Sequence, residues 1–278
     1  MTAIFASVEI LDIDSGAVET VLATDRHVEA PNWTPDGAAL IVNADGRLYR
    51  IALSDPALEE IDTGDLTRLN NDHGISPDGR QLVVCNSPGR GTALIHVLPI
   101  TGGTPTRITD QAPSWWHGWS PDGARMAYAC IRDGQFGIAT CPAVGGAETL
   151  LITSPHHYDG PDYTPDGRWI WFNSDRGGAM KLWRMASDGG TPEQMTTGDS
   201  VDWFPHPSPD GRHVCYLAYP PGTEGHPFGC DVELRLLPAE GGPPRRLLTL
   251  FGGQGTLNVP SWAPDSRRFA FVRYADTR

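Results

Sequence analysis

The sequence lacks the motifs that would reveal an activity directly, and it has few basic residues. It contains no Gly-x-Ser-x-Gly nucleophile elbow and no phosphate-binding loop that ends in Gly-Lys-Ser/Thr. Neither an α/β-hydrolase nor a P-loop nucleotide site is therefore expected. Its 21 Lys and Arg are outnumbered by 34 Asp and Glu, which gives a net charge of −13. Such a surface repels phosphate backbones and anionic lipids, so we expect no nucleic-acid partner and no membrane partner.

Cysteine is also scarce, and the five that occur form no recognisable framework. None belongs to a Cys-x-x-Cys pair, and Cys85, Cys130 and Cys215 fall within apolar runs of strand length. Buried free thiols are typical of a reducing compartment. Residues 1–6 contain neither a basic segment nor the start of a long apolar one, and nothing resembles a membrane span. We therefore expect a cytoplasmic protein; a periplasmic location is expected only if the sequence is a trimmed piece of a longer chain.

A four-residue turn signal is repeated along the chain. Its copies read Thr-Pro-Asp-Gly or Ser-Pro-Asp-Gly, with Ala-Pro-Asp-Ser last, at positions 34–37, 76–79, 120–123, 164–167, 208–211 and 263–266. Proline presets the first corner, aspartate bonds its own backbone, and glycine takes the positive φ that closes a tight turn. In the last copy Ser266 replaces glycine, so that turn is expected to be strained or of another type. The first four steps, of 42 or 44 residues, indicate a repeat protein.

Each turn is followed by segments that fit a propeller blade. An apolar run such as 169–172 comes directly after the turn, a second strand such as 181–185 follows, and paired glycines such as Gly189-Gly190 precede a last short strand. Four short antiparallel strands in about 44 residues are typical of one blade. We therefore predict an all-β protein, a six-bladed β-propeller with four strands per blade, formed as a single domain over residues 1–278.

The two ends of the chain are expected to share one blade. Residues 7–14 and 19–24 have no turn signal before them and resemble the second half of a blade, whereas residues 259–262 and 267–274 resemble the first half. Together they would close the ring and remove the free sheet edges that invite aggregation.

The Ser-Pro-Asp-Gly turns, each followed by a strand such as residues 168–172, resemble the PD40 or WD40-like repeats of TolB-type β-propellers over nearly the whole chain. The resemblance implies the propeller fold and a role in binding. TolB itself carries an additional N-terminal α/β domain and works in the periplasm with the peptidoglycan-associated lipoprotein. We do not expect that domain in this chain.

Polar and aromatic residues collect just before the turns, in segments that lie at one mouth of a propeller's central channel. Seven of the nine histidines are in or beside these segments or the insertion 220–229. Aromatic rings from adjacent blades would stack on a sugar or another planar-faced ligand, while acid and amide groups would bind its hydroxyls. The ligand-binding residues that we predict at this mouth are Asp72, Trp115, Trp116, His117, Tyr158, Asp159, Trp203, His206 and Asn258.

A divalent metal is the second interpretation of the histidines. Imidazoles from different blades, namely His73, His117, His157 and His206, would suit manganese, zinc or nickel. The turns and the histidine-rich mouth are also similar to those of oligogalacturonate lyases, whose TolB-like propeller holds a metal through histidines and a glutamine; this resemblance points to Gln254. A third interpretation is structural, because His73 and His117 share one repeat position and would each bond a neighbouring backbone carbonyl.

We therefore predict a TolB-like binding module, a monomer that presents the channel mouth to a protein partner or to a small polar ligand such as a carbohydrate. The alternative is a metal-dependent lyase acting on uronate oligosaccharides, in which a base and a metal remove the proton next to a carboxylate. The sequence supports both without separating an enzyme from a binding protein. The last two copies of the turn signal are 55 residues apart, and the insertion 220–229 accounts for most of this extra spacing. Loops of this length are often functional.

Overall fold

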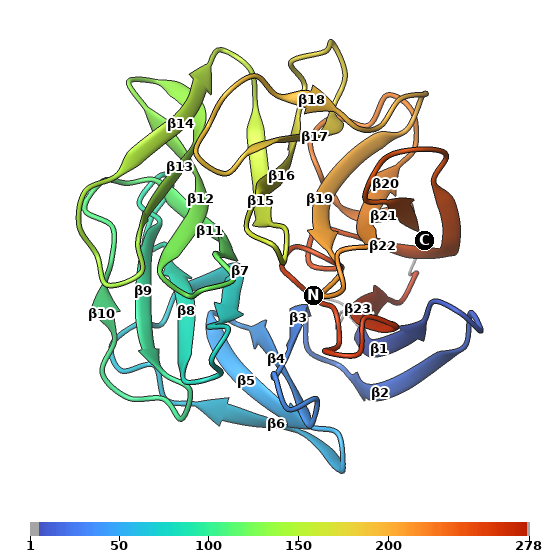
Figure 1. The fold of residues 1–278 in the computed structure, drawn as a ribbon. Helices are drawn as coiled ribbons and strands as arrows, with labels where there is room; N and C mark the ends of the chain where they lie inside the picture. Colours follow the sequence, from blue (N-terminus) through green and yellow to red (C-terminus); the bar gives the residue numbers. More distant parts are fainter. Residues whose placement is uncertain (1–5, 277–278) are drawn as a thin grey trace.

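The computed structural model describes residues 6–276, which form strands and turns only. Their 23 strands make six sheets that are arranged radially around one axis (Figure 1). The predicted six-bladed β-propeller is therefore confirmed. Within residues 6–276 no helix is long and apolar enough to cross a membrane. Residues 1–5, on which part of the expected cellular location depends, lie outside the described residues.

Five blades contain four antiparallel strands, and the first strand of each lies nearest the axis (Figure 1). The first two blades comprise β3 (Val28–Trp33), β4 (Ala39–Ala44), β5 (Arg47–Ala52) and β6 (Asp55–Ile61), then β7 (Leu69–Ile75), β8 (Gln81–Asn86), β9 (Leu94–Pro99) and β10 (Thr106–Arg107). The next two comprise β11 (Ser114–Trp119), β12 (Arg125–Arg132), β13 (Gln135–Pro142) and β14 (Thr149–Ser154), then β15 (Tyr158–Tyr163), β16 (Trp169–Ser174), β17 (Lys181–Ala186) and β18 (Glu193–Gln194). The fifth comprises β19 (Val201–Pro207), β20 (His213–Tyr219), β21 (Phe228–Pro238) and β22 (Arg245–Gly253).

The sixth blade is made from the two ends of the described chain. β1 (Ala6–Asp12) pairs in antiparallel register with β23 (Arg268–Tyr274), and β2 (Val18–Thr24) lies on the other side of β1. The guanidinium of Arg273 donates to both carboxylate oxygens of Glu9 at 2.9 to 3.1 Å. The predicted closure of the ring by both ends is therefore confirmed.

The inner position of this sixth blade differs from the other five. We predicted a strand over 259–262, but the only bridge formed there joins Trp262 to Phe269. Pro260 has no N–H group to donate to a ladder, which limits regular pairing in this segment. The Ala270 amide still donates to the Ser261 carbonyl at 2.9 Å, so the segment keeps its place beside β23.

The hydrophobic core lies between the blades. A strand such as β4 is buried at all six of its residues, because its sheet is covered on both faces by the neighbouring blades. Tryptophan supplies much of the contact area, and Trp116 and Trp203 are both at most 1% exposed. The blades are thus packed tightly enough to hold the inner strands in fixed positions around the axis.

The repeated turns have the predicted chemistry. Ser76 Oγ donates to Asp78 Oδ1 at 2.6 Å, the same carboxylate oxygen accepts the Arg80 amide at 3.1 Å, and Gly79 closes the turn with a φ of 71°. In the last copy Ser266 adopts a φ of 59°, close to that of the glycines it replaces. This turn is therefore of the same kind but strained, since a side chain disfavours a positive φ.

Candidate functional site

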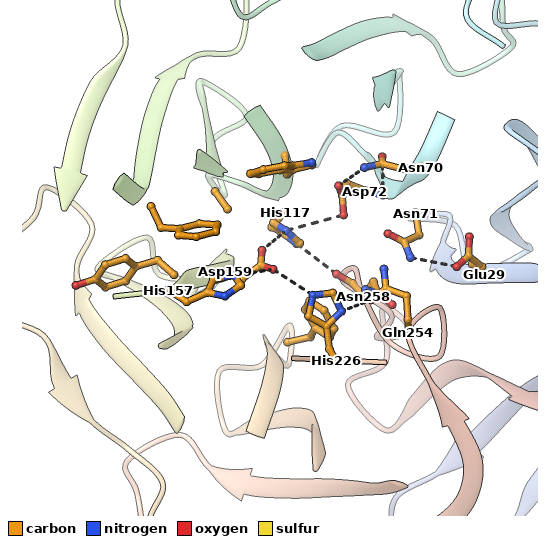
Figure 2. Close-up of a pocket in the computed structure, with 15 residues that line it drawn as sticks. Glu29, Asn70, Asn71, Asp72, His117, His157, Asp159, His226, Gln254 and Asn258 are labelled. Carbon is orange, nitrogen blue, oxygen red and sulfur yellow. Dashed lines mark hydrogen bonds and ion pairs between the residues drawn. The ribbon is translucent and has the colours of Figure 1, made fainter. Parts of the chain in front are cut away.

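A cavity of about 460 Å³ lies at one mouth of the channel, near the amino ends of the inner strands (Figure 2). Five inner strands contribute to it, together with β12, β13, the segment after β22 and the insertion. Its lining comprises Glu29, Asn70, Asn71, Asp72, Trp115, His117, Ala129, Phe136, His157, Tyr158, Asp159, Phe204, His226, Gln254 and Asn258. One side of the cavity is rich in rings, and the other carries carboxylate and amide groups.

One repeat position supplies much of this lining. The residues five positions before each turn are Glu29, Asn71, Trp115, Asp159, Trp203 and Asn258, and all but Trp203 face the cavity. Each of the five inner strands has an irregularity in its pairing at or next to this position. In three blades the next residue has a positive φ, namely Ala30, Gly160 and Phe204. Such bulges turn a side chain away from the sheet, here toward the mouth.

His117 lies near the centre of the lining (Figure 2). Its Nε2 is 2.9 Å from Asp159 Oδ1 and 3.9 Å from Asp72 Oδ1, while its Nδ1 is 3.3 Å from the carbonyl oxygen of Asn258. The carboxylate and the carbonyl both accept hydrogen bonds, so both ring nitrogens act as donors and the ring is an imidazolium. Burial alone would lower the pKa of His117. The hydrogen bond to Asp159 and the charges of Asp159 and Asp72 outweigh burial, and the pKa is raised.

The two carboxylates beside His117 are shifted in opposite directions. Burial raises the pKa of Asp72 to about 7, although the charge of His117 opposes the shift. Burial also acts on Asp159, but its hydrogen bond to His117 and the charges of His117, His157 and His226 hold its pKa well below the usual range. At neutral pH, Asp159 is therefore a fixed anion, whereas Asp72 is close to its midpoint.

Two further histidines flank Asp159. The Nε2 atoms of His157 and His226 both lie 3.9 Å from Asp159 Oδ2. The ring of His157 stacks on Phe136 with centroids 4.3 Å apart, and the ring of His226 meets Trp203 edge-on at 4.3 Å. His226 belongs to the insertion, so this long loop reaches into the mouth of the channel.

The structure brings six of the nine predicted ligand-binding residues to the cavity: Asp72, Trp115, His117, Tyr158, Asp159 and Asn258. The other three lie behind or below it. Trp116 packs against Gly74 in the core, and Trp203 supports His226 from behind. His206 is fully buried, and its Nδ1 lies 3.1 Å from Asp162 Oδ2. Both His206 and Asp162 sit two positions before their turns, one layer deeper in the channel.

The structure places the four histidines of the predicted metal set, His73, His117, His157 and His206, in different surroundings. His157 and His206 occupy repeat positions other than the one that His73 and His117 share. Each of the four has its own partner among carbonyls, carboxylates and rings. In residues 6–276 no group of three or more His, Cys, Asp or Glu is placed to hold a metal ion. The structural interpretation of the shared position does hold, since His73 and His117 each approach a backbone carbonyl, of Ile41 and Asn258 respectively.

Seven lining residues were absent from the predicted site, namely Glu29, Asn70, Asn71, Ala129, Phe136, Phe204 and His226, whereas the resemblance to the lyases had pointed to Gln254. The repeat itself contained the signal for two of them, because Glu29 and Asn71 share the position of Asp159. Phe136 and His226 carried no such signal. Phe136 lies on β13, the third strand of the blade that begins with β11. His226 lies on an insertion that has no counterpart in the other blades.

His73 belongs to the core, and its burial has a measurable consequence. The side chain is 0% exposed, and Nε2 lies 3.5 Å from the Ile41 carbonyl oxygen. Burial lowers its pKa to about 4, although backbone hydrogen bonds oppose the shift. An unfolded chain takes up this proton near pH 6.5, so protonation favours the unfolded state between these two values.

The free energy of unfolding is therefore expected to fall as the pH drops from about 6.5 toward 4, by up to about 1.4 kcal/mol per pH unit from this group. Above pH 6.5 the stabilising contribution of the neutral His73 ring is fully present. His73→Gln should remove this contribution together with its pH dependence. The free energies of unfolding of the variant and the parent should therefore differ by a constant at pH 7 to 8 and converge at pH 5. Urea unfolding at each pH measures this. Parallel losses in both proteins between pH 7 and pH 5 would contradict the assignment.

Comparison with known proteins supports the fold. A family model described as the TolB beta propeller domain (PD40) matches residues 111–225. An uncharacterised protein of Agrobacterium fabrum is 47% identical over 270 residues, covering 97% of this chain and 92% of that protein. A solved structure of a candidate TolB from Agrobacterium tumefaciens is 46% identical, with a TM-score of 0.95 over 98% of this chain and 99% of that one. The Tol-Pal system protein TolB of Francisella tularensis is 27% identical over 92% of this chain, which spans 59% of its length.

A more distant neighbour is an oligogalacturonate lyase in complex with manganese. It is 16% identical, with a TM-score of 0.60 over 87% of this chain and 72% of the lyase chain. At this identity the likeness shows the shared fold alone.

Proposed function

This chain belongs to the family of TolB-type β-propellers, and from that membership we propose that it is a binding module whose channel mouth takes a small polar ligand. The cavity around His117 and Asp159 carries the proposal. Its volume of about 460 Å³ is in the range of small-molecule sites. Of the two occupants predicted from the sequence, a small ligand fits better than a protein surface, because His117 and Asp72 are buried at 2% and 6% exposure.

The lining is divided as such a ligand requires. Trp115, Phe136, Tyr158 and Phe204 provide ring surfaces on which an apolar ligand face would rest. Opposite them, acid and amide groups are already oriented by one another: Asn71 Nδ2 donates to Glu29 Oε1 at 3.2 Å, and Asn258 Nδ2 donates to Gln254 Oε1 at 3.2 Å. Polar groups that are held in place before binding lose little entropy when a ligand arrives.

The charges of the lining favour this proposal over a uronate lyase. A uronate substrate carries a carboxylate, which binds well opposite Arg or Lys. The cavity has neither, and its acidic residues Glu29, Asp72 and Asp159 would repel an anion. We therefore place the lyase second and the binding module first.

Asp159→Asn is expected to weaken ligand binding by about 10- to 100-fold, which corresponds to the loss of one charged hydrogen bond. The probes are a panel of sugars, amino sugars, polyols and amino acids, and binding is measured by ligand-observed NMR and calorimetry. The matched control is Asp110→Asn at a carboxylate with 85% side-chain exposure, which should bind like the parent. Compounds that bind the parent and Asp159→Asn equally well bind outside this cavity. A panel without any binder would refute a small-ligand site.

A further inference from the structure

Two carboxylate oxygens at the mouth have no hydrogen-bond donor among the residues described. Asp72 Oδ2 accepts from Asn70 Nδ2 at 2.5 Å, but Asp72 Oδ1 lies 3.9 Å from His117 Nε2. Asp159 Oδ1 is bonded to His117, while Asp159 Oδ2 has only the contacts of 3.9 Å with His157 and His226. Distances of 3.9 Å are too long for hydrogen bonds.

From these open positions we infer that the ligand carries an ammonium group, which binds between Asp72 and Asp159 with its carbon skeleton against the rings of Trp115 and Phe136. The inference rests on the proposed function and names the class of ligand: an organic amine, such as an amine-bearing sugar or cyclic polyol. It follows from three independent features of the cavity, namely its open acceptors, its charge and its rings.

The spacing of the two carboxylates suits a shared ammonium. Asp159 Oδ1 and Asp72 Oδ1 lie 2.9 and 3.9 Å from the same atom, His117 Nε2, so both side chains border one position in the cavity. An ammonium nitrogen donates to carboxylates at about 2.8 Å and has three protons in a tetrahedral arrangement. An ammonium beside His117 has protons for more than one acceptor, and both carboxylates lie beside this ring in Figure 2.

The net charge of the lining requires a cation. Among its 15 residues are the acids Glu29, Asp72 and Asp159, no Lys and no Arg. The imidazolium of His117 balances one carboxylate. Asn43 and Asn71 donate hydrogen bonds to Glu29 at 2.9 and 3.2 Å, but their amide groups carry no charge that could balance this carboxylate. A ligand with one positive charge reduces the remaining negative excess, whereas a neutral ligand leaves it and an anion increases it.

The burial of Asp72 is an independent indication. Its side chain is 8% exposed, yet one of its oxygens is left without a donor. A buried carboxylate with an open acceptor is costly to maintain unless a partner arrives, because desolvation is not repaid by a hydrogen bond. Asp72 lines the cavity, so a ligand there can supply the missing partner.

The ring wall distinguishes an organic amine from a bare metal ion. Trp115 on β11 and Phe136 on β13 line the cavity near His117 and His157. Aromatic faces attract ammonium groups and the CH groups beside them, and they offer nothing to the coordination shell of a metal. Within residues 6–276 no group of three or more His, Cys, Asp or Glu is arranged to hold a metal ion.

The test compares three probes that share one ring: glucosamine, glucose and glucuronate. They carry an ammonium, a neutral hydroxyl and a carboxylate, respectively, and matched pairs of other cyclic amines and alcohols extend the series. We expect glucosamine or another amine to bind at least about 10-fold more tightly than its hydroxyl partner, and glucuronate to bind most weakly, as measured by calorimetry and NMR.

Asp72→Asn should weaken binding of the amine much more than binding of its neutral partner, so that the preference for the amine is lost. Thermal unfolding of the variant checks that it folds, and the comparison of probes on the parent protein decides the question if it does not. Equal binding of amine and alcohol at a site sensitive to Asp159→Asn would overturn the amine inference and leave the proposed function standing. If no compound of either kind binds, the proposed function itself fails.

Discussion

Gly74→Ala is expected to lower the free energy of unfolding by about 3 kcal/mol or more, the upper part of the range for overpacked cores. A Cβ at this position would lie 2.1 Å from Cη2 and 2.4 Å from Cζ3 of Trp116. The indole cannot move away easily, because Trp116 is 1% exposed and its amide donates to Cys85 Sγ at 3.1 Å. Urea unfolding followed by tryptophan fluorescence measures the loss.

The matched control is Gly89→Ala, where the nearest atoms to a new Cβ belong to Thr92 at an ordinary 3.7 Å. This variant should stay within about 0.5 kcal/mol of the parent. Gly74→Ala combined with Trp116→Leu should recover part of the lost stability, because the smaller side chain makes room for the methyl group. A cost below 1 kcal/mol for Gly74→Ala alone would show that the inner strands β7 and β11 are not packed as described.

Lys181→Met is expected to cost about 3 to 5 kcal/mol, since it leaves a buried carboxylate without its counter-charge. The ammonium of Lys181 lies 3.6 Å from Asp202 Oδ2 and also donates to the Ser200 carbonyl. Asp202 is 0% exposed. Burial raises the pKa of Asp202, and Lys181 opposes that shift. Thermal and urea unfolding at neutral pH would measure the loss.

The double variant Lys181→Met/Asp202→Leu should recover most of this loss, because replacing both partners removes the uncompensated charge. The control is Arg107→Ala, whose exposed partner is Asp110 and whose ion pair should contribute at most about 1 kcal/mol. Equal costs for the single and double variants at Lys181 would indicate that packing of the lysine stem, rather than charge, dominates at this position.

The fold was predictable because its signals are local. A turn such as 76–79 contains within four residues the proline, carboxylate and glycine that form it, and the spacing of the copies then fixes the number of blades. The closing blade followed from the same count. The strand expected at 259–262 was wrong in detail, because one proline decides how regularly such a short segment pairs.

The site was predictable only where the position of a residue in the repeat determines which way its side chain points. Asp159 and Asn258 share one repeat position and reach the same cavity, but His206, three positions nearer its turn than Trp203, lies a layer deeper. Counting histidines per loop could not separate these layers, so the predicted metal set combined histidines from different depths of the channel. The place of His226 depends on contacts of the insertion with Trp203 and Phe204, which no local pattern encodes.

The pairing of β1 with β23 has a consequence for the order in which the protein folds. Ala6 lies opposite Tyr274, whereas strands within the other blades pair with close neighbours in sequence. Contacts so distant in sequence form slowly, because the intervening chain must first be ordered. During synthesis on the ribosome the five four-stranded blades can assemble as they emerge, but the edge of β1 stays open until β23 appears. Until β23 is made, the growing chain thus carries one open edge of an apolar strand, and in that interval it most needs protection from aggregation.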